Sequence, residues 1–246
     1  MRNKLSLLVV SLMLGAGMCL AGPPTTDSQA TEGIQSRLDK SHVLKHGDVR
    51  VTFNNGVATL TGTVDNLGSK LDAEQAAQKS PGVAQVVDNI QVRAEGVHEQ
   101  QILEQARHAI VMYYAYGMFD NVNFEVRNGT LIVSGQVTQS FKKKDMENIL
   151  ERVKGVATLQ NNLEVLPNSP FDDRLRLQLA RAIYGNSLFT PYRDLALPPI
   201  HIIVKNGDVT LEGVVNSTLD RIQAGMLAHG TGLSFSVVNN LRVVKG

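Results

Sequence analysis

Two histidines have the spacing that a metal site on a helix would need. His42 and His46 are four residues apart, so on a continuous helix both imidazoles would lie on one face and could reach one ion. No cysteine or carboxylate completes such a site, and the pair occurs once in the chain. Histidines exposed to solvent in a loop are the simpler interpretation. We therefore predict no metal and no other cofactor.

Catalytic motifs are missing as well. A Ser-His-Asp hydrolase would need a strained nucleophile turn such as G-x-S-x-G, and the sequence contains none. Three Asn-Gly pairs are each followed by a second Gly, but the residues after them predict a hairpin. A phosphate-binding loop would instead lead into the N-terminus of a helix. The sequence predicts that the protein is not an enzyme.

A helix predicted from residue 170 carries the first group of side chains that could bind a partner. Opposite its apolar stripe, at 100° per residue, lie Arg174, Leu177, Arg181 and Tyr184. Guanidinium groups bind phosphate, and Tyr suits the polar boundary of a membrane. The alternative is a solvated helix face whose arginines extend along the surface, with Asp172 and Asp173 weakening the positive field.

Aromatic side chains in two connecting segments form the second group. The candidates are Tyr113, Tyr114, Tyr116, Phe119, Phe189 and Tyr192. Clustered Tyr and Phe in connecting segments are typical of a surface that binds lipid or protein. Packing of these segments against a neighbouring module explains the same pattern, and both interpretations stay open at this point.

The elements that must position these side chains are encoded by a phrase that occurs three times. The copies are NNGVATLTGTV (54–64), RNGTLIVSGQV (127–137) and KNGDVTLEGVV (205–215). A second phrase, NIQV, NLEV or NLRV, begins 33 residues after the first Gly of each copy, at Asn89, Asn162 and Asn240. A spacing that is constant through three copies indicates one folding unit repeated in tandem.

Each copy predicts a β-hairpin. Apolar residues alternate before the turn, as in Val49, Val51 and Phe53, and again after it. The turns are predicted at Asn55-Gly56, Asn128-Gly129 and Asn206-Gly207, because both positions of a two-residue hairpin turn need positive φ. Gly62, Gly135 and Gly213 each replace an inward side chain, and we expect a helix to cross close to the backbone there.

A helix is predicted after each hairpin, and another before it. Met146, Ile149, Leu150 and Val153 share a face in the second copy, and Leu219, Ile222 and Met226 do so in the third, so we expect both stripes to face a core. The predicted fold is α+β: three αββαβ modules, each a three-stranded mixed sheet packed against two helices. The predicted boundaries are 30–94, 97–167 and 169–244.

This element order, the Asn-Gly turn, the second Gly six residues on and the closing Asn-apolar-x-Val phrase resemble the BON domain (bacterial OsmY and nodulation). Three copies would cover nearly all of the chain, as in osmotically inducible periplasmic proteins. The resemblance implies an exported protein linked to osmotic and envelope stress, which binds phospholipids or acts as a chaperone for outer-membrane proteins. The third copy departs from the pattern. The Gly that precedes the last strand, Gly82 and Gly155 in the first two copies, shifts to Gly232 in the third, and a long insertion precedes the first strand of that copy.

The N-terminus resembles a secretory signal peptide. Arg2 and Lys4 precede an apolar run, and small residues follow, so we expect cleavage after Ala21 and a periplasmic location. An uncleaved anchor and a lipid anchor at Cys19 are the alternatives, although Met18 stands where a lipoprotein normally has a small residue. The chain has 24 basic and 23 acidic side chains, and loss of residues 1–21 would change its net charge from +1 to −1. Such a protein lacks the basic footprint of a nucleic-acid binder.

The sequence therefore predicts an exported envelope protein that binds phospholipid surfaces, or envelope clients, through the arginine and aromatic side chains of its second and third modules. A periplasmic chaperone for outer-membrane proteins is one alternative. A structural spacer or assembly module is the other.

Overall fold

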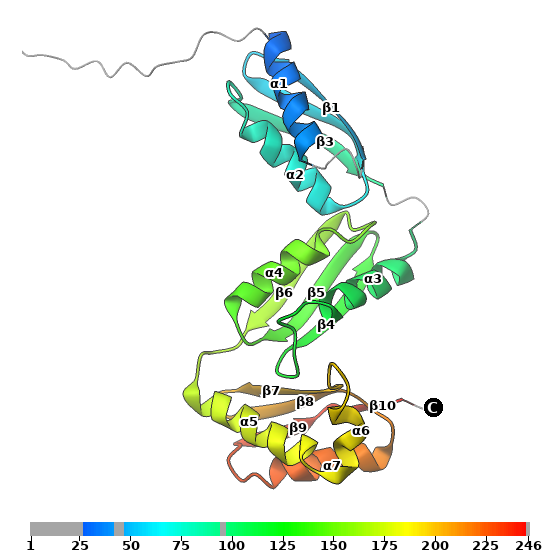
Figure 1. Ribbon diagram of the computed structural model, residues 1–246, viewed down its shortest axis with the longest axis vertical. Helices are drawn as coiled ribbons and strands as arrows, with labels where there is room; N and C mark the ends of the chain where they lie inside the picture. The colour runs from blue at the N-terminus through cyan, green and yellow to red at the C-terminus, as the bar shows by residue number, and fades with distance from the viewer. Residues whose placement is uncertain (1–26, 42–46, 94–96, 245–246) are drawn as a thin grey trace, which may run out of the picture.

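Three modules follow one another along the chain in the computed structural model, each with its own hydrophobic core (Figure 1). The structure describes residues 27–41, 47–93 and 97–244. The predicted signal segment, Cys19 and the His42/His46 pair lie outside the described residues. The predicted order of helix, strand, strand, helix and strand is confirmed in all three modules, and so is the α+β class.

Each module repeats this element order with small variations. The first contains α1 (Asp27–Lys40), β1 (Gly47–Asn54), β2 (Val57–Val64), α2 (Leu67–Gln78) and β3 (Gln85–Val92). The second contains α3 (Glu99–Val111), β4 (Asn121–Arg127), β5 (Thr130–Val137), α4 (Ser140–Leu150) and β6 (Thr158–Val165). The third contains α5 (Pro170–Tyr184), η2 (Ser187–Phe189), α6 (Thr190–Arg193), β7 (Ile200–Lys205), β8 (Asp208–Val215), α7 (Thr218–His229), β9 (Ser236–Asn239) and β10 (Arg242–Val243).

The three sheets share one mixed topology. The second strand of each module lies in the middle, antiparallel to the first strand and parallel to the third. Two helices cover one face of each sheet (Figure 1). In the third module the last strand is interrupted between β9 and β10, where Leu241 is buried in the core.

The Asn-Gly pairs form the predicted turns. Asn55, Asn128 and Asn206 have φ values of 47°, 50° and 53°, and the Gly after each has a φ between 74° and 85°. In the first hairpin the pair directly before the turn is Asn54 opposite Val57, so the loop has two residues. Asn and Gly tolerate positive φ better than other residues do, which is why this dipeptide defines the turn.

The second Gly of each hairpin is required for a different reason from the one predicted. Gly62, Gly135 and Gly213 have φ values of 127°, 118° and 111°. A Cβ atom on Gly135 would lie 2.1 Å from the carbonyl oxygen of Asn121, and the other two meet the corresponding carbonyl at 2.0 Å. The expectation of a crossing helix was therefore wrong. The close neighbour is the backbone of the adjacent strand, where a side chain has neither the space nor the favoured φ.

The second helices bury equivalent positions in the three modules, but with side chains of different size. In α4 the predicted stripe is confirmed, since Met146, Leu150 and the following Val153 are buried. In α7 the prediction was wrong. Its buried residues are Asp220, Ala224, Gly225 and Ala228, whereas Leu219, Ile222 and Met226 are exposed. The first module buries Ser69, Ala73 and Ala77 at the equivalent positions of α2.

The first two modules dock end to end. The backbone N–H groups of Leu67 and Gly68, at the start of α2, donate to the carbonyls of Val156 and Glu151 at 2.9 and 2.7 Å. Arg152 also pairs with Asp72 at 2.9 Å. The N-terminus of one helix thus meets the C-terminal end of another, which places complementary dipole ends together.

The second and third modules dock differently. The segment between α3 and β4 lies along the free edge of β7, where Met118 accepts a 2.7 Å hydrogen bond from the N–H of Ile202. Met118 and Phe119 pack against the core of the third module. The ring centroid of Tyr116 lies 5.6 Å from that of His201.

Candidate partner-binding surface

In the third module, α5 and α7 each begin at a serine that caps the N-terminus of the helix. Ser169 precedes α5 and accepts a hydrogen bond from the N–H of Asp172, while Pro170 occupies the first helical position. Ser217 caps α7 in the same way, accepting from the N–H of Asp220 at 3.0 Å. The two helices pack against each other on one face of the sheet, so their remaining sides face solvent (Figure 1).

The solvent sides of these helices form a surface that we call the outer helix face. Its members are Arg174, Leu177 and Arg181 of α5 with Leu219, Ile222 and Met226 of α7. Both triplets have the spacing i, i+3, i+7, which aligns side chains on one side of a helix. Leu219, Ile222 and Met226 are 64%, 51% and 62% exposed, and Leu177 is 50% exposed. Neighbouring helices lie about 8–10 Å apart, so the two ridges run side by side.

The outer helix face carries positive charge that the two aspartates of α5 leave uncancelled. Asp172 is fully buried and accepts hydrogen bonds from the N–H groups of Asn206 and Gly207, both at 2.9 Å, so it holds the β7–β8 turn. Asp173 pairs with Arg176. Within the described residues, no ion pair involves the exposed arginines Arg174, Arg181 and Arg221.

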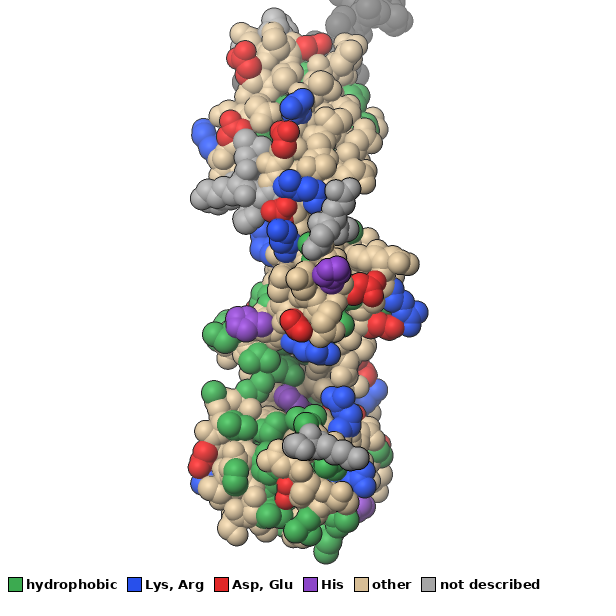
Figure 2. Space-filling view, turned by 90° about the vertical axis from the view of Figure 1, so that its right-hand side faces the viewer, with side chains coloured by type: hydrophobic (Ala, Val, Ile, Leu, Met, Phe, Trp, Pro, Cys, Tyr) green, Lys and Arg blue, Asp and Glu red, His purple; other side chains and the backbone are tan. Residues whose placement is uncertain are grey.

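The first two modules do not repeat this surface. In the first module the equivalent positions hold Gln29, Glu32 and Ser36, with Gly68, Leu71 and Gln75 on the second helix. In the second module they hold Gln101, Glu104 and His108, with Phe141, Lys144 and Asn148. Each of these modules thus has an acidic residue where the third has Leu177. Figure 2 shows another side of the molecule, where hydrophobic side chains again gather on the third module.

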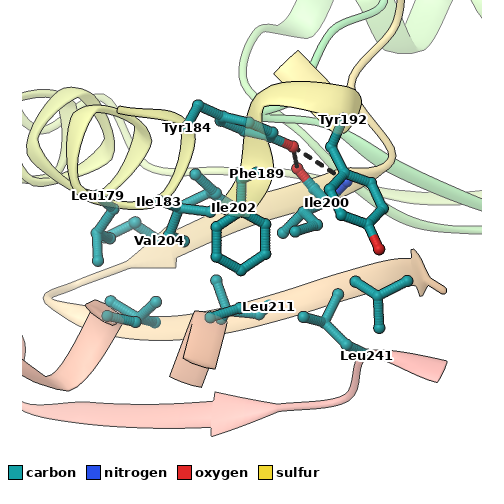
Figure 3. Packing of buried hydrophobic residues seen from close by; sticks show 14 of the residues in the cluster. Leu179, Ile183, Tyr184, Phe189, Tyr192, Ile200, Ile202, Val204, Leu211 and Leu241 are labelled. Atoms are coloured by element: carbon teal, nitrogen blue, oxygen red, sulfur yellow. Dashed lines mark hydrogen bonds between the residues drawn. The ribbon is translucent and has the colours of Figure 1, made fainter. Parts of the chain in front are cut away.

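The aromatic side chains of the third module fill its core (Figure 3). Tyr184 donates from its hydroxyl to the carbonyl of Ile200 at 2.6 Å and accepts from the N–H of the same residue at 3.1 Å. Tyr192 donates to Asp220 at 2.6 Å and accepts from the N–H of Asn216 at 2.7 Å. Phe189 is fully buried. The prediction that these three side chains face a partner was wrong. The insertion that carries Phe189 and Tyr192 folds back to complete the core of its own module, and Tyr184, the last residue of α5, bonds to Ile200.

Burial determines the ionisation of these tyrosines. It raises the pKa of the Tyr184 hydroxyl above its usual range, with a smaller opposing effect from the backbone hydrogen bond at Ile200. Burial also raises the pKa of Tyr192, and the carboxylate of Asp220 adds to the shift. Both hydroxyls therefore stay protonated at neutral pH, as their donation to a carbonyl and a carboxylate requires.

The aromatic residues of the second module have three different fates. Tyr113 is buried and donates to Asp145 at 2.6 Å, so it is not available to a partner as predicted. Tyr116 and Phe119 pack against the third module, which confirms the alternative of packing between modules. Tyr114 is 87% exposed and keeps a partner-binding role open.

Sequence reasoning missed the apolar half of the outer helix face. The signal was present, because Leu219, Ile222 and Met226 have helical spacing, but the same spacing is expected of a core stripe. The competing stripe of small residues, Ala224 and Ala228, has little hydrophobicity of its own. The same choice occurs in α2, which buries Ser69, Ala73 and Ala77 and leaves Leu71 39% exposed.

The described residues lack two further features. None of the groups of His, Asp and Glu side chains found there has the arrangement of a metal site. In the same part of the chain, no helix has the length and apolar character needed to cross a membrane.

Comparison with known proteins identifies a matching domain family. The sequence profile of the BON domain matches residues 26–94, 99–167 and 175–245. No match is found among curated proteins. Among solved structures, the chain is similar to the C-terminal domain of CdsD, a structural protein of the type III secretion system of Chlamydia trachomatis. That match has 16% identity and a TM-score of 0.26, and it covers 87% of this chain and 96% of the other.

A second solved structure is the periplasmic domain of PrgH, a type III secretion inner-membrane protein from S. typhimurium. It matches with 13% identity and a TM-score of 0.20, covering 80% of this chain and all of the other. At these TM-scores, neither structure informs the function of this chain. The three domain matches, by contrast, span most of the sequence and coincide with the three repeated modules. The protein therefore belongs to the BON domain family.

Proposed function

We propose that this protein works at the cell envelope by adsorbing to anionic phospholipid surfaces through the outer helix face of its third module. The observation that carries the proposal is the pairing of an exposed apolar ridge on α7 with an arginine-bearing ridge on α5. A surface helix of a soluble domain normally turns such an apolar stripe inward. An exposed apolar patch with a polar border is typical of a site for a membrane or a protein partner.

The mechanism is adsorption without a change of fold. Leu219, Ile222 and Met226 would enter the boundary between headgroups and acyl chains, while Arg174 and Arg181 bind phosphate oxygens beside them. A basic residue near an anionic membrane contributes about 1 kcal/mol. Transfer of the half-exposed apolar side chains adds roughly 25 cal/mol for each Å² of apolar surface removed from water. The apolar ridge supplies affinity for any bilayer, and the arginines supply the preference for anionic lipid.

Vesicle flotation tests this mechanism. The purified chain should float with vesicles containing phosphatidylglycerol and much less with vesicles of phosphatidylcholine alone. Raising the salt concentration should release it, because ions screen charges at a surface. Replacing Arg174 and Arg181 together with Gln should weaken binding to the anionic vesicles by roughly 30-fold, the equivalent of about 2 kcal/mol.

Two controls separate the contributions of charge and apolar contact. Arg127→Gln removes an exposed arginine of the second module that is paired with Glu125, and it should leave flotation unchanged. The combination of Leu219→Ser, Ile222→Ser and Met226→Ser should reduce recovery with both kinds of vesicle. If the three serines have no effect, the outer helix face is not the contact.

The same apolar ridge would also suit an unfolded outer-membrane protein, so the experiment includes that alternative. Suppose that neither kind of vesicle retains the chain, yet the chain suppresses aggregation of an unfolded barrel protein and the three serines abolish this effect. A chaperone function would then replace adsorption to lipid. If neither lipid nor client binds, a spacer or assembly module is the remaining interpretation.

A further inference from the structure

A cleft at the junction of the second and third modules has features of a small-molecule site. Its volume is about 680 Å³, within the range of roughly 300–1,000 Å³ that is usual for ligand pockets. One wall contains Val122 and Phe124 of β4, and the other contains Pro199 and Val214 of the third module. No residue of α5 or α7 lines it, so the cleft is separate from the outer helix face.

The docking of the two modules forms this cleft. The hydrogen bond between Met118 and Ile202 and the contact of Tyr116 with His201 hold β4 opposite the β7–β8 hairpin. Tyr116 and His201 both line the cleft as well. Because each wall comes from a different module, the cleft exists only while the modules are docked.

Charge within the cleft is unbalanced. Arg107 of α3 borders it on one side and Arg242 of β10 on the other, and within the described residues neither has an ion-pair partner. Figure 2 shows basic side chains on both sides of this junction. Glu212 is the one acidic residue of the lining, and it accepts a 2.7 Å hydrogen bond from the side-chain amide of Asn240. Two cations thus face a single carboxylate that already has a partner.

The apolar side chains of the cleft lie among polar ones, which include Asn121, Asn123 and the two arginines, and this combination matches a particular chemistry. A small inorganic anion would leave the side chains of Val122, Phe124 and Val214 exposed to water, and a neutral apolar molecule would leave both guanidinium groups without a counterion. A molecule with one anionic head and one hydrocarbon chain satisfies both parts of the cleft.

We propose that this cleft binds a single-chain anionic amphiphile. The phosphate or carboxylate head lies between Arg107 and Arg242, and the chain lies along Val122, Phe124 and Val214. The site would take one free molecule per protein, whereas the outer helix face would contact a membrane surface. The two proposals rest on different residues and do not depend on each other.

Calorimetric titration with dodecyl phosphate, below the concentration at which it forms micelles, tests the proposal. We expect one molecule to bind per chain. Dodecyl maltoside has the same chain without the charge, and inorganic phosphate has the charge without the chain. Both should bind at least tenfold more weakly. Equal binding of the maltoside would overturn the role of the arginines, and equal binding of inorganic phosphate would overturn the role of the apolar walls.

Single-residue variants locate the site. Arg107→Gln and Arg242→Gln should each weaken dodecyl phosphate binding about tenfold, the usual effect of losing one charge-assisted hydrogen bond. Glu212→Gln removes the opposing carboxylate and keeps an acceptor for Asn240, so it should tighten binding. Arg127→Gln serves as the matched control and should have no effect. A loss of equal size in Arg127→Gln would show that binding follows net charge and not the cleft.

Amide chemical shifts distinguish this site from the outer helix face. Dodecyl phosphate should perturb the amides of Val122, Glu212 and Val214, and the three serine substitutions on α7 should leave its affinity unchanged. Perturbations confined to α7 would overturn the cleft proposal. Flotation with anionic vesicles should in turn be insensitive to Arg107→Gln and Arg242→Gln, so either proposal can fail without the other.

Discussion

Gly135 illustrates how single residues determine the fold of each module. Its positive φ and the carbonyl oxygen of Asn121 leave no room for a Cβ atom, and Gly62 and Gly213 are in the same situation. Their fixed spacing in the sequence reflects a requirement of the backbone. The sequence revealed that a Gly was needed there, but it could not reveal that the neighbour was a strand.

A Gly135→Ala substitution should therefore destabilise the second module. The cost should be about 1–3 kcal/mol or more, because it combines a disfavoured φ with a steric clash. Amide hydrogen exchange in β5 measures the effect in this module separately from the other two. Gly117→Ala is the control, since a Cβ atom there meets no atom within 4 Å. Equal protection of β5 in both variants would contradict this account of Gly135.

At the scale of elements, α7 shows how a core can reverse the face that a sequence pattern predicts. Ala224, Gly225 and Ala228 let the helix approach the sheet closely, and the larger Leu219, Ile222 and Met226 remain outside. In α4 the large residues point inward, as the pattern predicts. The first module resembles the third, because α2 buries Ala73 and Ala77 at the equivalent positions.

Two substitutions on α7 should differ in their effect on stability. Ala228→Leu adds bulk to a closely packed site and should lower the stability of the third module by about 1–3 kcal/mol. Met226→Gln replaces an exposed side chain and should change it by no more than about 0.5 kcal/mol. Amide exchange in β8 measures both. A large loss for Met226→Gln with little loss for Ala228→Leu would mean that the sequence-predicted stripe is the buried one.

Much of the fold could be predicted from the sequence, and less of the surface. The alternation of apolar residues and the Asn-Gly pairs depend on local backbone preferences. Each repeat contains both signals, so the strands and turns could be predicted from the sequence. Arg174, Leu177 and Arg181 were placed correctly because a helix with one clear apolar stripe leaves little choice. Phe189 and Tyr192 were placed wrongly because their burial depends on how an irregular segment folds back, and no periodic pattern encodes that. Tyr184 was also placed wrongly, because it ends α5 and its hydroxyl bonds to the backbone of Ile200.

At the scale of the whole molecule, the two junctions between modules use different chemistry. The first combines backbone hydrogen bonds, such as that from the N–H of Leu67 to the carbonyl of Val156, with the ion pair of Arg152 and Asp72. The second places the ring of His201 under Tyr116, where the side chain is 9% exposed and its Nδ1 atom has no hydrogen-bond partner. A buried imidazole at a junction makes docking sensitive to protonation.

Burial lowers the pKa of His201 below its usual 6.5, although nearby Asp120 and Glu212 act in the opposite direction. The undocked or unfolded state, with an ordinary pKa, therefore takes up a proton first as the pH falls. The contribution of His201 to docking is complete above about pH 6.5 and is lost as the pH falls below that value towards the lowered pKa of the docked state.

The second junction should accordingly loosen between pH 7.5 and pH 5.5, while the first changes less. Amide protection factors, corrected for the intrinsic effect of pH on exchange, report on each junction: Ile202 for the second and Leu67 for the first. His201→Phe keeps a ring against Tyr116 and removes the titration, so Ile202 should lose its pH dependence in this variant. If Ile202 responds to pH equally with Phe at this position, another group controls the junction.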